Sequence, residues 1–428
     1  MAYNTDINLR KQMMYSVYVR NHSEAGNFKG VTKDLDRIKD LGTYIIWLMP
    51  IHPIGQKNKK GSLGCPYSIN DYRAINAEYG TLEDFKELIR ETHKRNMKLI
   101  IDVVYNHTSH ESVLWKEHAE WFFKKADGGP GNKVGDWTDV IDLDYGNKEL
   151  WDYQIDTLKY WVSLGVDGFR CDVAPLVPIE FWKEAREQVS KINKDTIWLA
   201  ETTDSYFLKY LRDNKINAHS DGEIYEAFDI AYDYDTYKYF LEYLQGDITL
   251  EEYLEKKRMQ ESIYPSNYVK LRFLENHDTL RAAFLLNQNA DIKMWTAFML
   301  FEKGLALIYA GQECKDINTP SLFDRDLVAS NEDREFINYL KQLIELKKSD
   351  IFAYGSYDIV KCKKKGVIEV HYSYNGKTLI GIFNVERKIG EYPIDLMDGC
   401  YKNLINGICL HVENKKFRLP QYAIIIEI

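Results

Sequence analysis

Residues Gly165–Asp172 read GVDGFRCD and predict a short buried strand with charged residues at its carboxyl end. Gly165 ends the helical pattern that precedes it, and Val166 begins an apolar run that Arg170 and Asp172 close. Because side chains alternate along a strand, Arg170 and Asp172 share one face. A cation beside a carboxylate holds it ionised, which suits a nucleophile. A buried ion pair that only orders a barrel would give the same pattern.

The segments on both sides of this strand alternate between buried strands and amphipathic helices, such as Ile179–Ile192. About eight strand–helix units in roughly the first 350 residues predict an α/β protein with a parallel (β/α)8 TIM barrel. A doubly wound open sheet also alternates in this way, but no GxGxxG motif follows the first strand. The predicted strands are Met13–Val19, Tyr44–Met49, Lys98–Val104, Val166–Asp172, Thr196–Ala200, Ile224–Ile230, Val269–Leu274 and Leu305–Tyr309.

Two regions depart from this alternation. Residues 107–147 predict a short inserted subdomain after the third strand, within a catalytic barrel domain of residues 1–350. Farther on, Val367–Tyr374 and Lys377–Phe383 alternate around Asn375-Gly376, which is a strong hairpin signal. Residues 351–428 therefore predict a C-terminal antiparallel β domain.

Charge and cysteine content exclude several classes of partner and site. The net charge of −9 argues against nucleic acid or an anionic membrane as a partner. The six cysteines form no CxxC pair and have no regular spacing, so we expect no disulfide framework, and a reducing compartment fits. The first residues lack the apolar core of a signal peptide, and no stretch is long enough to span a membrane. These observations favour a cytoplasmic protein and say nothing about its oligomeric state.

Polar side chains gather where the predicted strands end, which is where barrel enzymes carry their chemistry. Several carboxylates and one arginine, without phosphate-binding glycines, favour glycoside hydrolysis, in which one acid protonates the leaving oxygen and another attacks. A metal hydrolase would use similar residue types, but HExxH is absent and Arg170 would oppose a cation beside Asp172. The residues at the strand ends are Asp102, Asn106, His107, Arg170, Asp172, Glu201, Glu275, His277 and Asp278.

Four of these segments resemble the signature regions of the α-amylase family, glycoside hydrolase family 13. The resemblance extends from about Met14 to Lys348, with the regions in the family's order, and is highly specific for the family. Within the family, the chain resembles an intracellular bacterial-type α-amylase or maltodextrin glucosidase. The four segments are DVVYNH (Asp102–His107), GFRCD (Gly168–Asp172), WLAET (Trp198–Thr202) and ENHD (Glu275–Asp278).

The resemblance implies three catalytic carboxylates and a retaining mechanism. Asp172 would be the nucleophile that forms a covalent glycosyl intermediate, and Glu201 would be the general acid and base. Asp278 would be the third carboxylate, which binds sugar hydroxyls and distorts the ring. The family's retaining chemistry further implies that the carboxyls of Asp172 and Glu201 lie roughly 5–5.5 Å apart.

The resemblance also implies five substrate-binding or positioning residues. His107 and His277 would bind hydroxyls of the sugar at the cleavage site, and Tyr67 would stack on its ring. Arg170 would hold the nucleophile ionised, and Asp102 would position Arg170 and Tyr67.

The resemblance is weaker at the calcium site that many members of the family carry. Asn106 matches a family ligand and is the one candidate here, but Val173-Ala174-Pro175-Leu176 replaces the Lys-His pair of many endo-acting amylases. A solvated acidic loop explains the acids of the insert as well as a metal site does. We therefore expect that no metal and no other cofactor is required. The acids of the insert are Asp136, Asp139, Asp142 and Asp144.

The expected substrate is a soluble maltodextrin or starch-type α-glucan, cleaved internally at α-1,4 bonds. The short insert would leave the cleft open, which favours endo attack. An oligo-α-1,6- or α-1,4-glucosidase, a transglycosylase or a phosphorylase of the same family would share every residue above. A non-catalytic glucan-binding protein is the remaining alternative, although such a protein would be expected to lack at least one of the three carboxylates.

Overall fold

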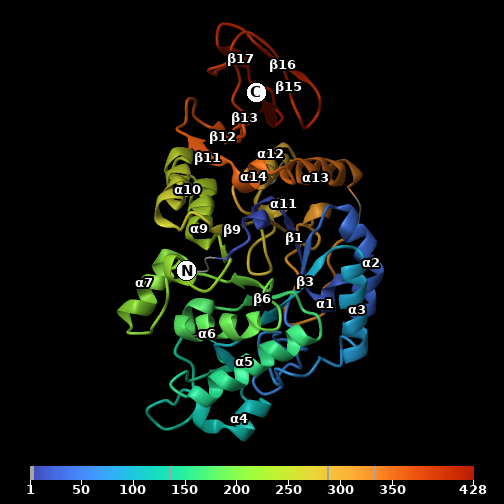
Figure 1. Ribbon diagram of the computed structural model, residues 1–428, viewed down its shortest axis with the longest axis vertical. Coiled ribbons are helices and arrows are strands. Elements are labelled where there is room, and N and C mark those ends of the chain that lie inside the picture. The colour runs from blue at the N-terminus through green and yellow to red at the C-terminus, as the bar shows by residue number, and fades with distance from the viewer. Residues whose placement is uncertain (1–3, 135–136, 287–288, 331–332) are drawn as a thin grey trace. The chain divides into compact units, whose positions relative to one another are not determined.

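The computed structural model describes residues 4–134, 137–286, 289–330 and 333–428. The chain packs as two compact units, and Figure 1 traces it from end to end. The first unit comprises Met1–Thr5, Met14–Tyr232 and Thr319–Ala329. The second comprises Asp6–Met13, Asp233–Asn318 and Ser330–Ile428.

Eight parallel strands close into a barrel in the order β1-β10-β9-β8-β7-β6-β3-β2, which confirms the predicted TIM barrel. Every residue of these strands is buried except Lys98, which is half-buried, so both faces of the barrel wall are covered. The strands are β1 (Met13–Val17), β2 (Ile45–Leu48), β3 (Lys98–Val103), β6 (Gly168–Cys171), β7 (Ile197–Ala200), β8 (Ile230–Tyr232), β9 (Val269–Arg272) and β10 (Leu305–Tyr309).

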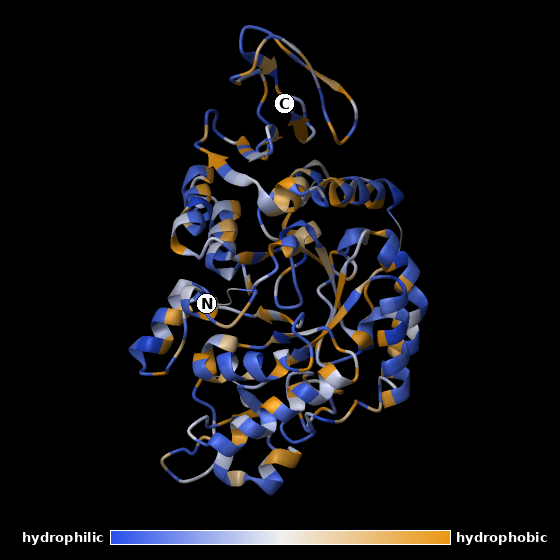
Figure 2. Ribbon diagram, viewed as in Figure 1, coloured by the Kyte–Doolittle hydropathy of each residue, from blue (hydrophilic) through white to orange (hydrophobic). Residues whose placement is uncertain are grey.

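The helices of the first unit show how the sequence sets their ends. Helix α3 begins at a capping box, in which Thr81 and Asp84 each accept a hydrogen bond from the other's backbone. Helix α2 begins at Phe28, because the Asn27 side chain accepts a hydrogen bond from the Gly30 N–H. Figure 2 shows hydrophilic and hydrophobic residues interspersed along α2 and α3, and the hydrophobic ones include the buried Leu35 and Leu88. The helices of this unit are α1 (Val19–His22), α2 (Phe28–Asp40), α3 (Leu82–Lys94), α4 (Val113–Glu117), α5 (Lys148–Ser163), α6 (Ile179–Ser190), α7 (Ser205–Asp213), α8 (Asp221–Ile224) and the 3-10 turns Ala119–Trp121 and Ala174–Leu176.

One predicted strand, Ile224–Ile230, is misplaced. The short helix α8 occupies its first residue, and the barrel strand β8 begins only at Ile230. A capping box between Ser220 and Glu223 starts that helix, and it was a readable signal in the sequence. The apolar residues that follow it had favoured a strand over this helical turn.

The insert after the third strand is built on a two-stranded antiparallel ladder. Strand β4 (His107–Ser109) pairs with β5 (Val140–Asp142), and His107 lies opposite Asp142. The ladder begins four residues after the end of β3, so the insert starts beside the barrel's carboxyl end. The predicted short inserted subdomain is therefore present.

The second unit carries the remaining barrel helices and the C-terminal sheets. Strands β12 and β13 form the predicted hairpin, in which Asn375 and Gly376 both adopt positive φ, as the turn requires. The helices are α9 (Tyr234–Gln245), α10 (Leu250–Ile263), α11 (Ala282–Leu285), α12 (Asn289–Phe301), α13 (Arg334–Lys347), α14 (Ile351–Tyr354) and the 3-10 turns Ile7–Lys11 and Gln312–Cys314. The strands outside the barrel are β11 (Ser356–Val360), β12 (Ile368–Tyr374), β13 (Lys377–Phe383), β14 (Glu391–Pro393), β15 (Gly399–Lys402), β16 (Cys409–Val412), β17 (Lys416–Arg418) and β18 (Ile424–Glu427), all in antiparallel pairs.

One disulfide is present, although the sequence predicts no disulfide framework. Cys400 and Cys409 are joined, with their Cα atoms 5.6 Å apart. They lie diagonally across the β15–β16 ladder, since Cys400 faces His411 and Lys402 faces Cys409. The Cα separation lies within the range that a disulfide spans.

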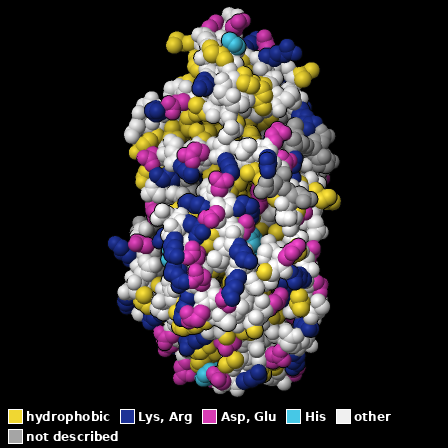
Figure 3. Space-filling model, turned by 90° about the vertical axis from the view of Figure 1, so that its right-hand side faces the viewer, with side chains coloured by type: hydrophobic (Ala, Val, Ile, Leu, Met, Phe, Trp, Pro, Cys, Tyr) yellow, Lys and Arg dark blue, Asp and Glu magenta, His cyan; other side chains and the backbone are white. Residues whose placement is uncertain are grey.

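Charged side chains of both signs alternate over the face that carries α2 and α3, as Figure 3 shows. Short ion pairs account for part of this pattern, including Arg37 with Asp34 and Arg95 with Asp36. The net charge is therefore not gathered into one acidic field on this face. Among the described residues, no helix is both long enough and apolar enough to cross a membrane.

Candidate active site

Arg170 is the centre of a buried ionic cluster at the ends of three neighbouring barrel strands. Its Nη1 bonds Asp102 Oδ1 at 2.9 Å and Asp172 Oδ1 at 2.8 Å, and its Nη2 bonds Glu201 Oε1 at 2.8 Å. Asp102 lies opposite Arg170 in the β3–β6 register, and Glu201 follows β7 directly. The structure thus brings together four residues that lie up to 99 positions apart in the sequence.

Exposure separates the three carboxylates of this cluster. The Asp102 side chain is 0% exposed, whereas those of Asp172 and Glu201 are 10% and 12% exposed. A reactant that enters from solvent can therefore touch Asp172 and Glu201 but not Asp102.

One guanidinium cannot neutralise three carboxylates in a buried site. Burial raises the pKa of Asp102 to about 7, although Arg170 and Tyr67 act in the opposite direction. Because the three acids repel one another, the cluster favours keeping one proton near neutral pH. A proton held beside two reachable carboxylates is what acid catalysis needs.

Three aromatic rings surround the Arg170 guanidinium. Tyr67 donates its hydroxyl to Asp102 Oδ2 at 3.2 Å, and Tyr232 accepts from Arg170 Nε at 3.1 Å. The guanidinium carbon lies 5.3–5.5 Å from the ring centroids of Trp47, Tyr67 and Tyr232. The sequence singled out Tyr67 but missed Trp47 and Tyr232, since Tyr232 ends the strand that was misplaced.

The backbone of Val173 also contacts the cluster, which no residue pattern indicated. Its N–H donates to Glu201 Oε2 at 2.7 Å. Val173 holds a left-handed conformation with φ of 36°, which is uncommon and strained for a β-branched residue. Both oxygens of Glu201 are therefore engaged, one in an ion pair with Arg170 and one as the acceptor of the Val173 N–H.

Asn106 and His107 follow the end of β3 as predicted. His107 is buried and packs against Trp137, with ring centroids 5.5 Å apart. Burial lowers the pKa of His107 below its usual value, so the ring is neutral at pH 7 and offers one donor and one acceptor. The Asn106 amide lies 3.1 Å from His107 Nδ1 and donates to Asp142 Oδ1 at 3.4 Å.

His277 and Asp278 belong to the second unit and follow β9. His277 Nε2 lies 3.1 Å from Asp278 Oδ2; the His277 side chain is 1% exposed and that of Asp278 is 41% exposed. Glu275, two residues earlier, is fully engaged by Arg281 Nη1 at 2.6 Å and by the Ala282 N–H. Burial raises the pKa of Glu275 to about 7, against the effect of Arg281. Glu275 is thus bound within the fold, whereas Asp278 is open to solvent.

The acidic side chains described in the insert pair or hydrogen-bond with other groups of the protein. Asp139 pairs with Lys60 at 2.8 Å, and Asp144 accepts from the Gly146 N–H at 3.0 Å. Asp142 accepts from the Lys133 N–H at 2.7 Å and from Asn106. Asp136 lies outside the described residues. Within the residues that the structure covers, no group of three or more His, Cys, Asp or Glu side chains is arranged to hold a metal ion.

Comparison with known proteins identifies the family. Residues 16–351 match the family model described as "Alpha amylase, catalytic domain". The chain belongs to the α-amylase family. Residues 358–426 of this α-amylase-family protein match the "Bacterial Alpha amylase C-terminal domain". The α-amylases and maltogenic amylases among its relatives are retaining glycoside hydrolases, and the family needs no organic cofactor, although it also includes transferases. The family match and the α-amylase relatives indicate a glycoside hydrolase.

Solved structures and a curated relative support the same assignment. An α-amylase from Lactobacillus plantarum is 46% identical with a TM-score of 0.95, covering 99% of this chain and 100% of that one. A noncanonic maltogenic α-amylase, AmyB from Thermotoga neapolitana, is 33% identical with a TM-score of 0.88, covering 98% and 99%. An intracellular maltogenic amylase of Bacillus subtilis is 27% identical over 343 residues, which are 76% of this chain and 55% of that protein.

Proposed function

We propose that the protein cleaves α-1,4-glucosidic bonds within soluble maltodextrins, with retention of anomeric configuration. The observation that carries this proposal is the single buried guanidinium that bonds three carboxylates, two of which reach solvent. A retaining glycosidase needs such a pair, with one acid ionised to attack and the other holding a proton.

The proposed reaction has two steps. Asp172 attacks the anomeric carbon while the bond from that carbon to the leaving glucan oxygen breaks, and Glu201 gives its proton to that oxygen. Water then attacks the same carbon, Glu201 takes up a proton from the water, and the bond to Asp172 breaks. Arg170 holds Asp172 ionised in the first step, since it lies 2.8 Å away.

The remaining site residues are proposed to bind the sugar at the cleaved bond. Neutral His107 suits a sugar hydroxyl, because each ring nitrogen can donate or accept. Tyr67 would stack on the ring, and the hydrogen bond from its hydroxyl to Asp102 holds it in place. His277 and Asp278 follow another strand of the same parallel barrel, and we assign them contacts with sugar hydroxyls, Asp278 as the third carboxylate.

The products formed from maltoheptaose test the proposed activity. We expect early products of several lengths, because internal bonds are cut, and NMR should show α-anomers first, because configuration is retained. Maltose as the main early product would favour the maltogenic activity named for the Thermotoga and Bacillus relatives. Glucose released singly from the first minutes would contradict the endo mode. Products longer than the substrate, or a requirement for phosphate, would indicate transfer in place of hydrolysis.

We further propose that no metal is required. Two lysines, Lys60 and Lys133, would supply the positive charge at the insert instead. A calcium ion near Asn106 does not fit the groups present there. Asn106 turns an N–H toward Asp142, whose other oxygen accepts from Lys133. Burial raises the pKa of Asp142 overall, and the Lys133 ammonium, which bonds the Leu143 carbonyl at 3.2 Å, acts against that rise.

This proposal predicts stability that is independent of calcium. We expect the melting temperature to be the same, within about 2 °C, in EDTA and in calcium chloride. We expect Lys60→Met to cost about 1 kcal/mol, because it leaves buried Asp139 without its cation while Lys60 itself is partly solvated. Calorimetry measures the melting temperatures and the stability lost in Lys60→Met. The control is Lys124→Met, which replaces an exposed lysine of the insert. A rise of more than about 5 °C on adding calcium would contradict the proposal.

The proposal also covers the domain organisation, the location and the partner of the protein. We assign residues 1–350 to the catalytic domain, with residues 107–147 as its insert, and residues 351–428 to an accessory β domain. A cytoplasmic location is supported by the relative named as intracellular. The net charge of −9 supports a neutral glucan as the partner, with no role for nucleic acid or a membrane.

A further inference from the structure

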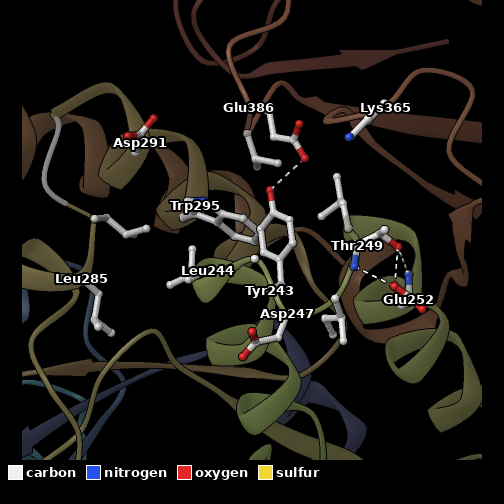
Figure 4. Close-up of a pocket in the computed structure, with 15 residues that line it drawn as sticks. Tyr243, Leu244, Asp247, Thr249, Glu252, Leu285, Asp291, Trp295, Lys365 and Glu386 are labelled. Carbon is white, nitrogen blue, oxygen red and sulfur yellow. Dashed lines mark hydrogen bonds between the residues drawn. The ribbon is translucent and has the colours of Figure 1, made fainter.

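The second unit contains a pocket that shares no residue with the Arg170 cluster, among those described. It has a volume of about 500 Å³, which lies within the usual range of small-molecule sites. The end of α9, the start of α10, helices α11 and α12 and two loops of the C-terminal region form its walls (Figure 4).

The pocket has an apolar wall and a polar rim. Figure 4 shows Leu244, Leu285 and Trp295 on one side, with the Tyr243 ring between them and Glu386. Carboxylate, ammonium and hydroxyl groups line the rest. These polar residues are Asp247, Thr249, Glu252, Asp291, Lys365 and Glu386.

Charges around this pocket are already balanced by protein groups. Asp291 pairs with Arg387 at 3.0 Å, and Glu386 pairs with Lys388 at 3.0 Å. Of the other charged residues on the rim, Glu252 caps α10, while Asp247 and Lys365 are both exposed and opposite in sign. An ionic ligand would therefore find no strong excess of opposite charge, whereas a neutral ligand would find acceptors and donors.

The walls are held in place without a ligand. Tyr243 donates its hydroxyl to Glu386 Oε1 at 3.2 Å, and the Glu386 N–H donates to the Gly366 carbonyl at 3.2 Å. Gly366 has φ of 79°, and a Cβ there would lie 2.6 Å from Glu386 Cβ, so only glycine allows the two loops to approach so closely. A preformed pocket loses little entropy when it binds.

We propose that this pocket is a second, non-catalytic binding site for a short α-glucan chain. A sugar ring combines an apolar C–H face with a rim of neutral hydroxyls, which matches the apolar wall and the balanced polar rim. Because maltodextrin is the ligand class, the inference rests on the proposed function of the enzyme. The pocket holds glucan on the protein independently of the reacting carboxylates.

Calorimetric titration with maltoheptaose tests the second site. In the full-length Asp172→Asn protein, which leaves the ligand intact, we expect two maltoheptaose molecules to bind per chain. Adding Asp247→Ala and Glu386→Ala removes two acceptors from the rim, and we expect one of the two binding events to weaken at least ten-fold. Adding Asp358→Ala, an exposed carboxylate on β11 outside the pocket, serves as the matched control and should leave both events unchanged.

Two outcomes would overturn the inference: a single binding event in the Asp172→Asn parent, or two unchanged events after the pocket substitutions. A melting curve close to that of the parent shows that the pocket variant is folded. In an otherwise wild-type chain, the same pocket substitutions should leave maltotriose hydrolysis within about two-fold. Because that activity is measured separately, failure of the pocket and failure of the proposed function are distinguishable.

Discussion

We expect Asp172→Asn to slow maltoheptaose hydrolysis by at least roughly 10⁴-fold, equivalent to about 5 kcal/mol of lost transition-state stabilisation. The amide cannot supply the carboxylate that attacks the anomeric carbon. It keeps one oxygen that can accept from Arg170 Nη1, which bonds Asp172 Oδ1 at 2.8 Å in the native protein. The buried guanidinium therefore stays paired, and the fold should survive. Steady-state kinetics and a melting curve measure the two effects.

A matched substitution separates this role from a general effect of charge. Asp156→Asn removes an exposed carboxylate on α5, paired only loosely with Lys159 at 3.3 Å, and should leave turnover unchanged. Turnover of Asp172→Asn within ten-fold of wild type would remove Asp172 as the nucleophile. The Arg170 cluster would then be the buried ion pair that only orders the barrel.

The barrel could be predicted because its signal is local. Strands covered on both faces are short runs of apolar residues, and seven of the eight were found in this way. The exception, β8, has three residues and is separated by five residues from α8, a short helix capped by Ser220. A strand this short shows almost no periodicity. The apolar residues that precede it therefore predict the strand too early in the sequence.

The candidate site could be predicted in part, because alternation along a strand is also a local signal. Alternation along β6 placed Arg170 and Asp172 on one face, and the structure shows both bonded within one cluster. The contacts of Val173 and Tyr232 were not predictable, because each depends on geometry set by distant parts of the chain. Val173 acts through a backbone N–H in a left-handed conformation, for which the valine side chain gives no signal. The Cys400–Cys409 pair was missed for a related reason, since strand register brings the two together.

We expect Glu201→Gln to slow maltoheptaose hydrolysis roughly 10³-fold, because the leaving glucan oxygen receives no proton. One Glu201 oxygen pairs with Arg170 and the other accepts from the Val173 N–H, so an acid form must turn its proton-bearing oxygen away from one of these two donors. Glutamine cannot carry that proton at all. With 4-nitrophenyl α-maltoside, whose leaving group departs without protonation, we expect the first step to be nearly as fast as in wild type. Stopped-flow release of nitrophenol measures that step directly.

The same substrate distinguishes the two carboxylates. Asp172→Asn should be slow with both substrates, because the nucleophile is needed whatever the leaving group. In Glu201→Gln the glycosyl intermediate should accumulate, because no base activates water, and added azide should restore turnover since it needs no base. Equal losses on maltoheptaose and the nitrophenyl substrate, with no effect of azide, would contradict the acid–base role. Glu201 would then serve only to balance the charge of Arg170, 2.8 Å away.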